Sequence, residues 1–174
     1  MISDLRYRIR SARFEELAQL AVVEQRAGML FSSTAHAFVC AGPNVPLEVA
    51  VERWRTGFVL VAVDEGDTVV GFALGGELMG GAFLQELDVE PLHGRRGIGK
   101  SLLEAVFGWA AQNGFRTAVL STFADVPWNA PFYTRCGFKI LSEADFTAGM
   151  RRVREQESRS GLALDSRVFM RLVL

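Results

Sequence analysis

A turn rich in glycine and basic residues is the part of this sequence with the clearest chemical meaning. It reads Gly94-Arg95-Arg96-Gly97-Ile98-Gly99-Lys100-Ser101 and lies between a predicted strand and a predicted helix. Glycines allow successive backbone N–H groups to point at one focus, and the positive end of the following helix adds to the attraction for an anion. A loop that only turned the chain would not need three cations. The turn therefore predicts a local anion-binding site.

The same residues match a second pattern, the phosphate loop G-x-x-x-x-G-K-[ST] of nucleotide hydrolases, through Gly94, Gly99, Lys100 and Ser101. In those enzymes the loop follows the first buried parallel strand, and a later apolar strand ends in an Asp that helps to hold magnesium. Here the turn follows a predicted hairpin and a third strand, and Asp125 comes only after a break. We therefore rank nucleoside triphosphate binding second.

Strands and one long helix must position this turn. Apolar runs at 58–63 and 68–74, joined by a turn at 64–67, are typical of an antiparallel hairpin, and a third strand is predicted at 82–89. The clearest helix, 98–113, has Leu102, Ala105, Val106 and Trp109 on one face and is followed by a strand at 115–121. A strand, a crossover helix and a strand form a right-handed unit with parallel strands.

The flanking segments are predicted with less regular patterns. A strand at 5–11 precedes a helix that starts near Phe14, has Phe14, Leu17, Ala18 and Ala21 on one stripe and ends at Gly28. The other predicted elements are an irregular stretch at 29–46, short helices at 47–55 and 129–135, a strand starting at 138–141, a partly helical stretch at 143–160 and a terminal strand at 167–174.

Length and composition exclude several classes of protein. A chain of 174 residues with 49% hydrophobic and 22% charged residues predicts one globular domain over 1–174. A net charge of −1 gives no electrostatic field that would attract nucleic acid or an acidic membrane. No apolar run is long enough for a secretory signal or a membrane helix. Cys40 and Cys136 have no metal or redox spacing, so we expect a cytoplasmic protein without a bound metal.

Two separated motifs resemble the Gcn5-related N-acetyltransferase (GNAT) family. The first is the strand Leu84-Gln85-Glu86-Leu87-Asp88-Val89 with Pro91 and the glycine turn, and the second is Ser121-Thr122 followed by Asn129-Ala130-Pro131-Phe132-Tyr133-Thr134-Arg135-Cys136-Gly137-Phe138. Both occur in the family order and at the family spacing. The resemblance covers nearly the whole chain, although residues 29–57 and 142–165 match only loosely.

The resemblance implies an α/β (α+β) fold with a mixed, mostly antiparallel central sheet flanked by helices. Its fourth and fifth strands would splay apart, and acetyl-coenzyme A would enter the gap. The family usually has Gln or Arg where this sequence has Gly94. Binding of the phosphates would therefore depend on Arg95, Arg96 and the amides of Gly97 to Lys100. The residues expected to bind the coenzyme are Leu87, Asp88, Val89, Gly94, Arg95, Arg96, Gly97, Ile98, Gly99, Lys100, Ser101 and Asn129, with Leu87 to Val89 bonding the pantetheine arm through their main chain.

Acyl transfer from a thioester to an amine requires a group that removes the amine proton and a group that protonates the leaving thiolate. The resemblance places Tyr133 at the family position whose phenol approaches the coenzyme sulfur, which makes it the candidate general acid; otherwise it is a packed aromatic. Glu86 is the candidate base, but strand alternation can turn it away, and a water chain is the alternative. Asn129 either bonds the coenzyme or caps a helix, and His93 is expected to be an exposed loop residue.

The sequence thus predicts an N-acetyltransferase that acts by direct transfer on a primary amine of a small molecule, a peptide N-terminus or a lysine. The alternatives are nucleoside triphosphate binding at the turn and a non-catalytic sensor of acyl-coenzyme A. Segments 29–55 and 143–165 would set acceptor specificity, and no rule converts their residues into a substrate. Whether the chain forms a homodimer is left open.

Overall fold

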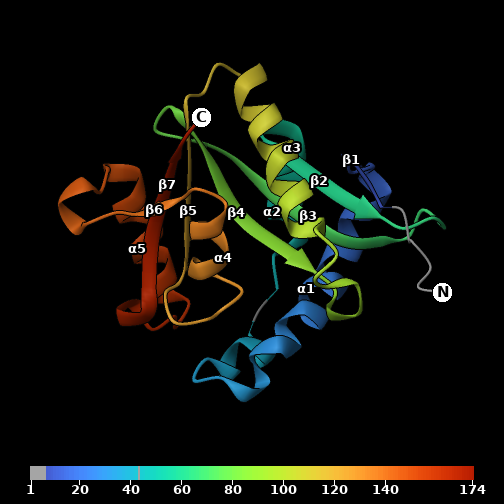
Figure 1. The fold of residues 1–174 in the computed structure, drawn as a ribbon, viewed down its shortest axis with the longest axis horizontal. Helices are drawn as coiled ribbons and strands as arrows, with labels where there is room; N and C mark the ends of the chain where they lie inside the picture. Colours follow the sequence, from blue (N-terminus) through green and yellow to red (C-terminus); the bar gives the residue numbers. More distant parts are fainter. Residues whose placement is uncertain (1–6, 43) are drawn as a thin grey trace. The chain divides into compact units, whose positions relative to one another are not determined.

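Seven strands form one mixed sheet in the computed structural model, which describes residues 7–42 and 44–174. Their order across the sheet is β1-β2-β3-β4-β5-β7-β6 (Figure 1). The strands are β1 Arg8–Ser11, β2 Phe58–Val63, β3 Val69–Leu78, β4 Gly81–Val89, β5 Thr117–Phe123, β6 Lys139–Ile140 and β7 Arg167–Val173. The pairs β1–β2, β2–β3, β5–β7 and β6–β7 are antiparallel, whereas β4 and β5 are parallel. The predicted mixed, mostly antiparallel sheet is confirmed.

The helices are α1 Leu20–Gly28, α2 Leu47–Thr56, α3 Ile98–Gln112, α4 Ala130–Arg135 and α5 Ala148–Arg159. Together with the strands they divide into two compact units, Met1–Gly76 with Glu86–Trp109 and Glu77–Gln85 with Ala110–Leu174. Each unit takes its residues from two separate stretches of the chain. The single domain over 1–174 stays a prediction.

The core of the first unit lies on the two faces of β2, all six residues of which are buried. Because side chains alternate along a strand, Val59, Val61 and Val63 share one face, where they cluster with Leu17, Leu20 and Val23 of the first helical segment. On the other face, the Phe58 ring lies 4.8 Å from the ring of Trp109 in α3. Because both faces of β2 are buried, its sequence is an uninterrupted apolar run.

The first helical segment corrects a prediction. The expected buried stripe was Phe14, Leu17, Ala18 and Ala21, but Phe14 is 53% exposed, Ala18 is exposed, and Leu17, Leu20 and Val23 are the buried residues. The reason is that Phe14–Gln19 forms a 3-10 helix, and only from Leu20 does the segment become an α-helix. The predicted stripe assumed an α-helical period from Phe14 onward, which the 3-10 segment does not have.

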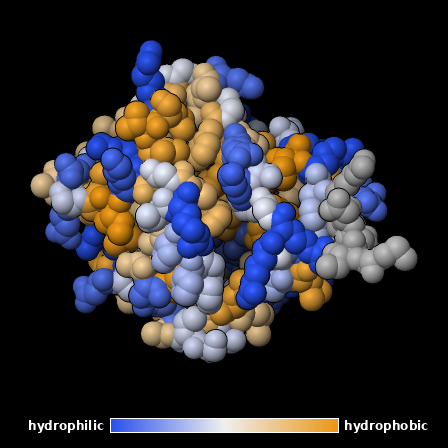
Figure 2. Space-filling view, in the orientation of Figure 1, coloured by the Kyte–Doolittle hydropathy of each residue, from blue (hydrophilic) through white to orange (hydrophobic). Residues whose placement is uncertain are grey.

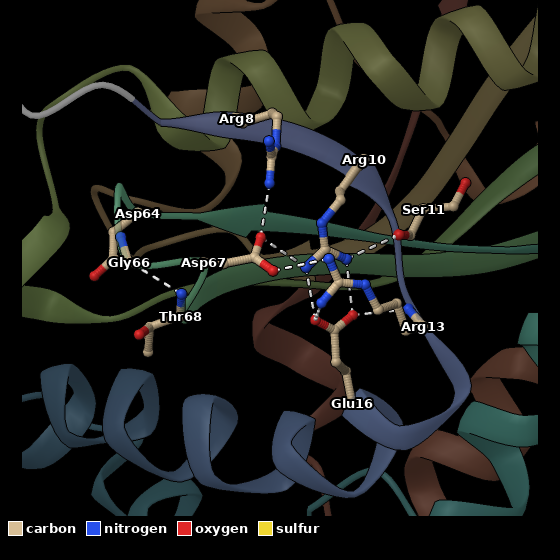
Figure 3. A network of polar contacts seen from close by, with 9 residues as sticks. All are labelled: Arg8, Arg10, Ser11, Arg13, Glu16, Asp64, Gly66, Asp67 and Thr68. Carbon is tan, nitrogen blue, oxygen red and sulfur yellow. Dashed lines mark hydrogen bonds and ion pairs between the residues drawn. The ribbon is translucent and has the colours of Figure 1, made fainter.

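An ion-pair network joins the start of the chain to the hairpin turn and to the 3-10 helix (Figure 3). Glu16 accepts hydrogen bonds from both terminal nitrogens of Arg10, at 2.8 and 2.6 Å, and from the backbone N–H of Arg13 at 2.7 Å. Asp67, in the turn between β2 and β3, accepts bonds from Arg8 and Arg10 and pairs with Arg13 at 2.8 Å. Three arginines thus surround two carboxylates.

The second unit is built on β7, which pairs with β5 over seven residue pairs and with β6 over two. One face of these strands carries Val119 and Phe169, which cluster with Phe83, Phe146 and Met150, the last of these from α5. At the end of this apolar cluster, Arg167 donates to the Glu157 carboxylate at 2.6 Å and to the Ser121 carbonyl oxygen at 3.1 Å. Helix α5 is therefore attached both by apolar packing and by a buried ion pair.

The parallel pairing of β4 with β5 covers only Ala82–Leu84 and Ala118–Leu120. Both strands continue beyond the last pair, to Val89 and Phe123. The predicted connection of two parallel strands through helix α3 is therefore confirmed, and the ladder between these strands is short.

Several predicted boundaries differ from the structure. Strand β3 continues through Gly75 and Gly76 to Leu78, because these glycines lie against Gly57, where a side chain would collide with the carbonyl oxygen of Gly75. The stretch predicted as irregular contains 3-10 helices at Met29–Ser33 and Ala37–Ala41, and the predicted strand at 138–141 is limited to Lys139–Ile140. The N-terminal strand is confirmed from Arg8 onward; its predicted residues Leu5 and Arg6 lie outside the described residues.

The surface shows no single dominant character. Hydrophilic and hydrophobic residues are interspersed over the face drawn in Figure 2, which agrees with a net charge of −1. Within residues 7–42 and 44–174, no helix combines the length and the apolar character that crossing a membrane requires.

Candidate functional site

The glycine turn links β4 to α3 in the first unit. After a short 3-10 helix at Pro91–His93, Gly94 is extended, with φ −62° and ψ 162°, Arg95 has φ 58° and Gly97 has φ 80°. A left-handed conformation costs an L-residue about 1–2 kcal/mol, so Arg95 holds an unfavourable backbone conformation, whereas glycine at 97 avoids this cost. Alternation of left- and right-handed residues is the geometry that makes successive N–H groups converge.

A run of unpaired amides follows from this geometry. Among the described residues, six consecutive backbone N–H groups donate no hydrogen bond, until the N–H of Ser101 bonds the carbonyl oxygen of Gly97 at 3.0 Å. They belong to Arg95, Arg96, Gly97, Ile98, Gly99 and Lys100. The last three are the first donors of α3, which a helix cannot satisfy internally. Six free donors beside the positive end of a helix form a site that an anion can satisfy.

The cations around the turn differ in their partners. Arg95 and Arg96 are exposed and form no ion pair with a carboxylate of the described residues. Arg96 instead donates from Nη1 to the phenol oxygen of Tyr7 at 3.3 Å. Lys100 Nζ lies 3.7 Å from Glu104 one helical turn away. Within residues 7–42 and 44–174, two arginines of the turn thus have no carboxylate that neutralises them, and their charge is available for an anionic ligand.

The other predicted residues of the first unit lie on the final part of β4. Glu86 and Asp88 share one face of this strand, and Leu87 and Val89 share the other. Asp88 Oδ2 is buried and has no hydrogen-bond partner among the residues that the structure describes. Burial raises the pKa of Asp88 well above its usual value, and the charges of Glu86 and Glu24 raise it further.

Glu24 of α1 is the third carboxyl group of this part of the first unit. Burial raises its pKa, although the backbone N–H of Val45 donates to it at 2.7 Å. Glu24 and the partial burial of Asp88 were not predicted from the sequence. Nothing in the sequence pattern around Glu24 indicated that α1 brings a third acid near Glu86 and Asp88.

Two predicted site residues belong to the second unit. Tyr133 is buried in α4, and its ring meets those of Phe132 and Phe138 edge-on, with centroids 5.1 and 5.7 Å away. Asn129 precedes the first residue of α4, yet its side chain makes no capping hydrogen bond. Helix capping therefore does not explain Asn129, and its side chain is not used to satisfy the helix.

The sequence model of the Acetyltransferase (GNAT) family matches residues 29–138, which is more than half of the chain. The chain belongs to the GNAT family. The match includes the whole turn and the whole of α4, which contains Tyr133. GNAT proteins are acetyltransferases, so the general activity of the chain is acyl transfer.

Solved structures of other GNAT proteins share this fold. The PaiA N-acetyltransferase of Thermoplasma acidophilum, in complex with coenzyme A, has 18% identity and a TM-score of 0.69, over 97% of this chain and 99% of that one. The ribosomal-protein-S18-alanine N-acetyltransferase of Escherichia coli has 19% identity and a TM-score of 0.66, over 97% and 94%. The N-acetylglutamate synthase of Neisseria gonorrhoeae, complexed with coenzyme A and N-acetyl-glutamate, has 14% identity and a TM-score of 0.71, over 97% of this chain and 35% of that one.

Proposed function

We propose that this GNAT protein transfers an acetyl group from acetyl-coenzyme A directly to a primary amine of a small molecule, a peptide N-terminus or a lysine side chain. The observation that carries the proposal is the turn at 94–100. Here six consecutive backbone N–H groups have no acceptor, and two neighbouring arginines have no carboxylate partner, in the part of the chain that the structure describes. This set fits the diphosphate of coenzyme A, because two phosphates offer many acceptor oxygens and negative charge to donors that the protein leaves unused.

Further contacts with the donor are assigned by resemblance to the family. The main chain of Leu87, Asp88 and Val89 would bond the pantetheine arm, and Ser101 would add a hydroxyl beside the phosphates. The parallel pairing of β4 ends at Leu84, so these three residues are not used in pairing with β5. The Asn129 side chain, which does not cap α4, is proposed to bond the coenzyme.

Three groups of this chain take part in the acetyl transfer. The amine attacks the thioester carbonyl carbon as a neutral molecule, and Glu86, or a water chain if Glu86 is too far, takes its proton. Backbone amides of Leu87 to Val89 stabilise the charge that develops on the carbonyl oxygen. When the carbon–sulfur bond breaks, the phenol of Tyr133 gives its proton to the departing thiolate.

Binding of the donor is tested by calorimetric titration of coenzyme A and by thermal denaturation with acetyl-coenzyme A. Arg95→Gln and Arg96→Gln should each weaken the affinity on the order of tenfold, because each removes charge-assisted hydrogen bonds to phosphate. Arg55→Gln, which alters an exposed arginine of α2, is the matched control and should leave the affinity unchanged. Equal affinities of all four proteins, or binding of magnesium nucleotides instead, would contradict the proposal.

Transfer is tested by a screen of amine acceptors in which release of the coenzyme thiol is measured. Tyr133→Phe should lower the turnover number with little change in coenzyme A affinity, since it removes a proton donor and keeps the packed ring. A non-catalytic sensor would behave differently: the wild-type protein would bind acetyl-coenzyme A but release no thiol with any amine.

A further inference from the structure

The glycine turn is attached to the beginning of the chain by two hydrogen bonds in series. Arg96 Nη1 donates to the Tyr7 phenol oxygen at 3.3 Å, and this oxygen lies 3.0 Å from His93 Nδ1. The Tyr7 and His93 rings also meet edge-on, with centroids 5.7 Å apart and an interplanar angle of 84°. Tyr7 comes immediately before β1, 86 residues from His93 along the sequence, and all three residues belong to the first unit.

The direction of these bonds follows from the donors available. A guanidinium group can only donate, so the phenol oxygen accepts from Arg96. The same oxygen donates to His93 Nδ1 when the imidazole proton is on Nε2, and accepts from Nδ1 when the proton is there; either tautomer keeps the bond. The Tyr7 hydroxyl is thus bonded to His93 and to Arg96 at the same time.

The histidine end of this series is anchored in the main chain. The backbone N–H of His93 bonds the carbonyl oxygen of Glu90 at 2.9 Å, and the N–H of Glu90 bonds the carbonyl oxygen of Val70 at 2.9 Å. Glu90 is in turn fixed by Arg26 of α1 at 2.7 Å. His93 is therefore connected through Glu90 to Val70 of β3 and to Arg26 of α1.

We propose that Tyr7 is a positioning residue for the acyl donor, holding the Arg96 guanidinium at the turn so that its remaining N–H groups meet the coenzyme diphosphate. This role rests on the proposed function of the turn. A free arginine side chain loses about 2 kcal/mol of rotamer entropy when a ligand fixes it. Tyr7 removes part of that loss before the ligand arrives, because the bond to Nη1 already restricts the side chain. Arg95, its neighbour, has no such tether among the described residues.

The test is a double-mutant cycle on coenzyme A affinity, measured by calorimetry. Tyr7→Phe keeps the ring but loses the hydroxyl, and should raise the dissociation constant about threefold to tenfold. Arg96→Gln should have its own effect, and Tyr7→Phe with Arg96→Gln should be no weaker than Arg96→Gln alone. The matched control is Tyr7→Phe with Arg95→Gln, where the two effects should add. Additive effects in both cycles would overturn the proposal.

A donor without phosphates separates positioning from general damage to the fold. With S-acetyl-pantetheine, Tyr7→Phe should leave kcat/KM at the wild-type value, whereas KM for acetyl-coenzyme A should rise with kcat retained. An equal loss with both donors would overturn the role of Tyr7. Wild-type protein that binds no coenzyme A would overturn the proposed function and this role together, whereas a wild-type affinity in Tyr7→Phe would overturn this role alone.

Discussion

Arg10 and Glu16 form a two-pronged ion pair whose carboxylate side chain is only 7% exposed and whose guanidinium side chain is 18% exposed. The two hydrogen bonds, 2.8 and 2.6 Å long, connect β1 to the 3-10 helix that follows it (Figure 3). A pair that is buried to this degree behaves differently from an exposed one, because loss of one partner takes away the closest counter-charge of a group that water reaches poorly.

Replacement of Glu16 by Gln should therefore destabilise the protein by about 1–3 kcal/mol, since Arg10 would lose its closest counter-charge and keep only the longer bond to Asp67. Urea denaturation followed by circular dichroism measures the change. The neighbouring exposed Glu15→Gln is the matched control and should shift the free energy of unfolding by less than about 0.5 kcal/mol. Similar losses in both variants would show that the pair with Arg10 is not the cause.

The same pair makes stability depend on acid. The hydrogen bond from Arg10, followed by the bond from the Arg13 backbone, lowers the pKa of Glu16 below its usual value of 4.5. A carboxyl group with a lowered pKa stabilises the folded state above the unfolded pKa, and this contribution disappears as the pH falls through the folded value. Between pH 7 and pH 3 the melting temperature of the wild type should therefore fall more steeply than that of Glu16→Gln. Parallel curves would contradict the assignment.

Asp88 should have the opposite effect on stability. Burial raises its pKa, so the unfolded chain gives up its proton at a lower pH than the folded protein does. Stability is then lost as the pH rises above the usual value near 3.8, until the folded pKa is reached. Asp88→Asn cannot ionise and should raise the melting temperature at pH 7, with a smaller gain at pH 4. A gain of the same size at both pH values would mean that ionisation of Asp88 is not responsible.

Two glycines of the first unit should respond oppositely to alanine. A Cβ at Gly71 would lie 2.9 Å from the Asp88 carbonyl oxygen, which is backbone and cannot move freely, so Gly71→Ala should cost about 1–3 kcal/mol. Gly108 is exposed and lies in the middle of α3, and a Cβ there would meet nothing within 4 Å. Gly108→Ala should therefore add about 0.5–1 kcal/mol of stability. Chemical denaturation of the two variants measures both signs.

The sequence pattern predicts an element well where a buried apolar run is bounded on both sides by residues that favour turns. Strand β2 was predicted at its observed residues, Phe58–Val63, because an apolar β-branched run lies between Gly57 and the Asp64 turn. The stripe of the first helix was wrong because the choice between a 3-10 and an α-helix depends on tertiary packing of Leu17 and Leu20, which leaves no mark in the local pattern. Strand β3 was predicted to end at residue 74 and instead continues past Gly75, which pairs with Phe58 of β2.

The candidate site, like the fold, could be predicted only in part from the sequence. The turn at 94–101 could be predicted, because glycines, cations and a helix start are contiguous in sequence. The contact of Arg96 with Tyr7 could not, since it joins residues 89 positions apart and neither residue is unusual where it stands. The roles of Tyr133 and Glu86 remain predictions that the proposed kinetics must test.

The way the two units share the chain has a consequence during synthesis on the ribosome. The backbone passes from one unit to the other after Gly76, after Gln85 and after Trp109. No stretch emerging from the exit tunnel before Trp109 contains either unit in full, so neither can complete its core during the first half of translation. One face of β2 can pack against Leu17, Leu20 and Val23 as soon as the strand is made, whereas Phe58 on the other face has to wait for Trp109 of α3.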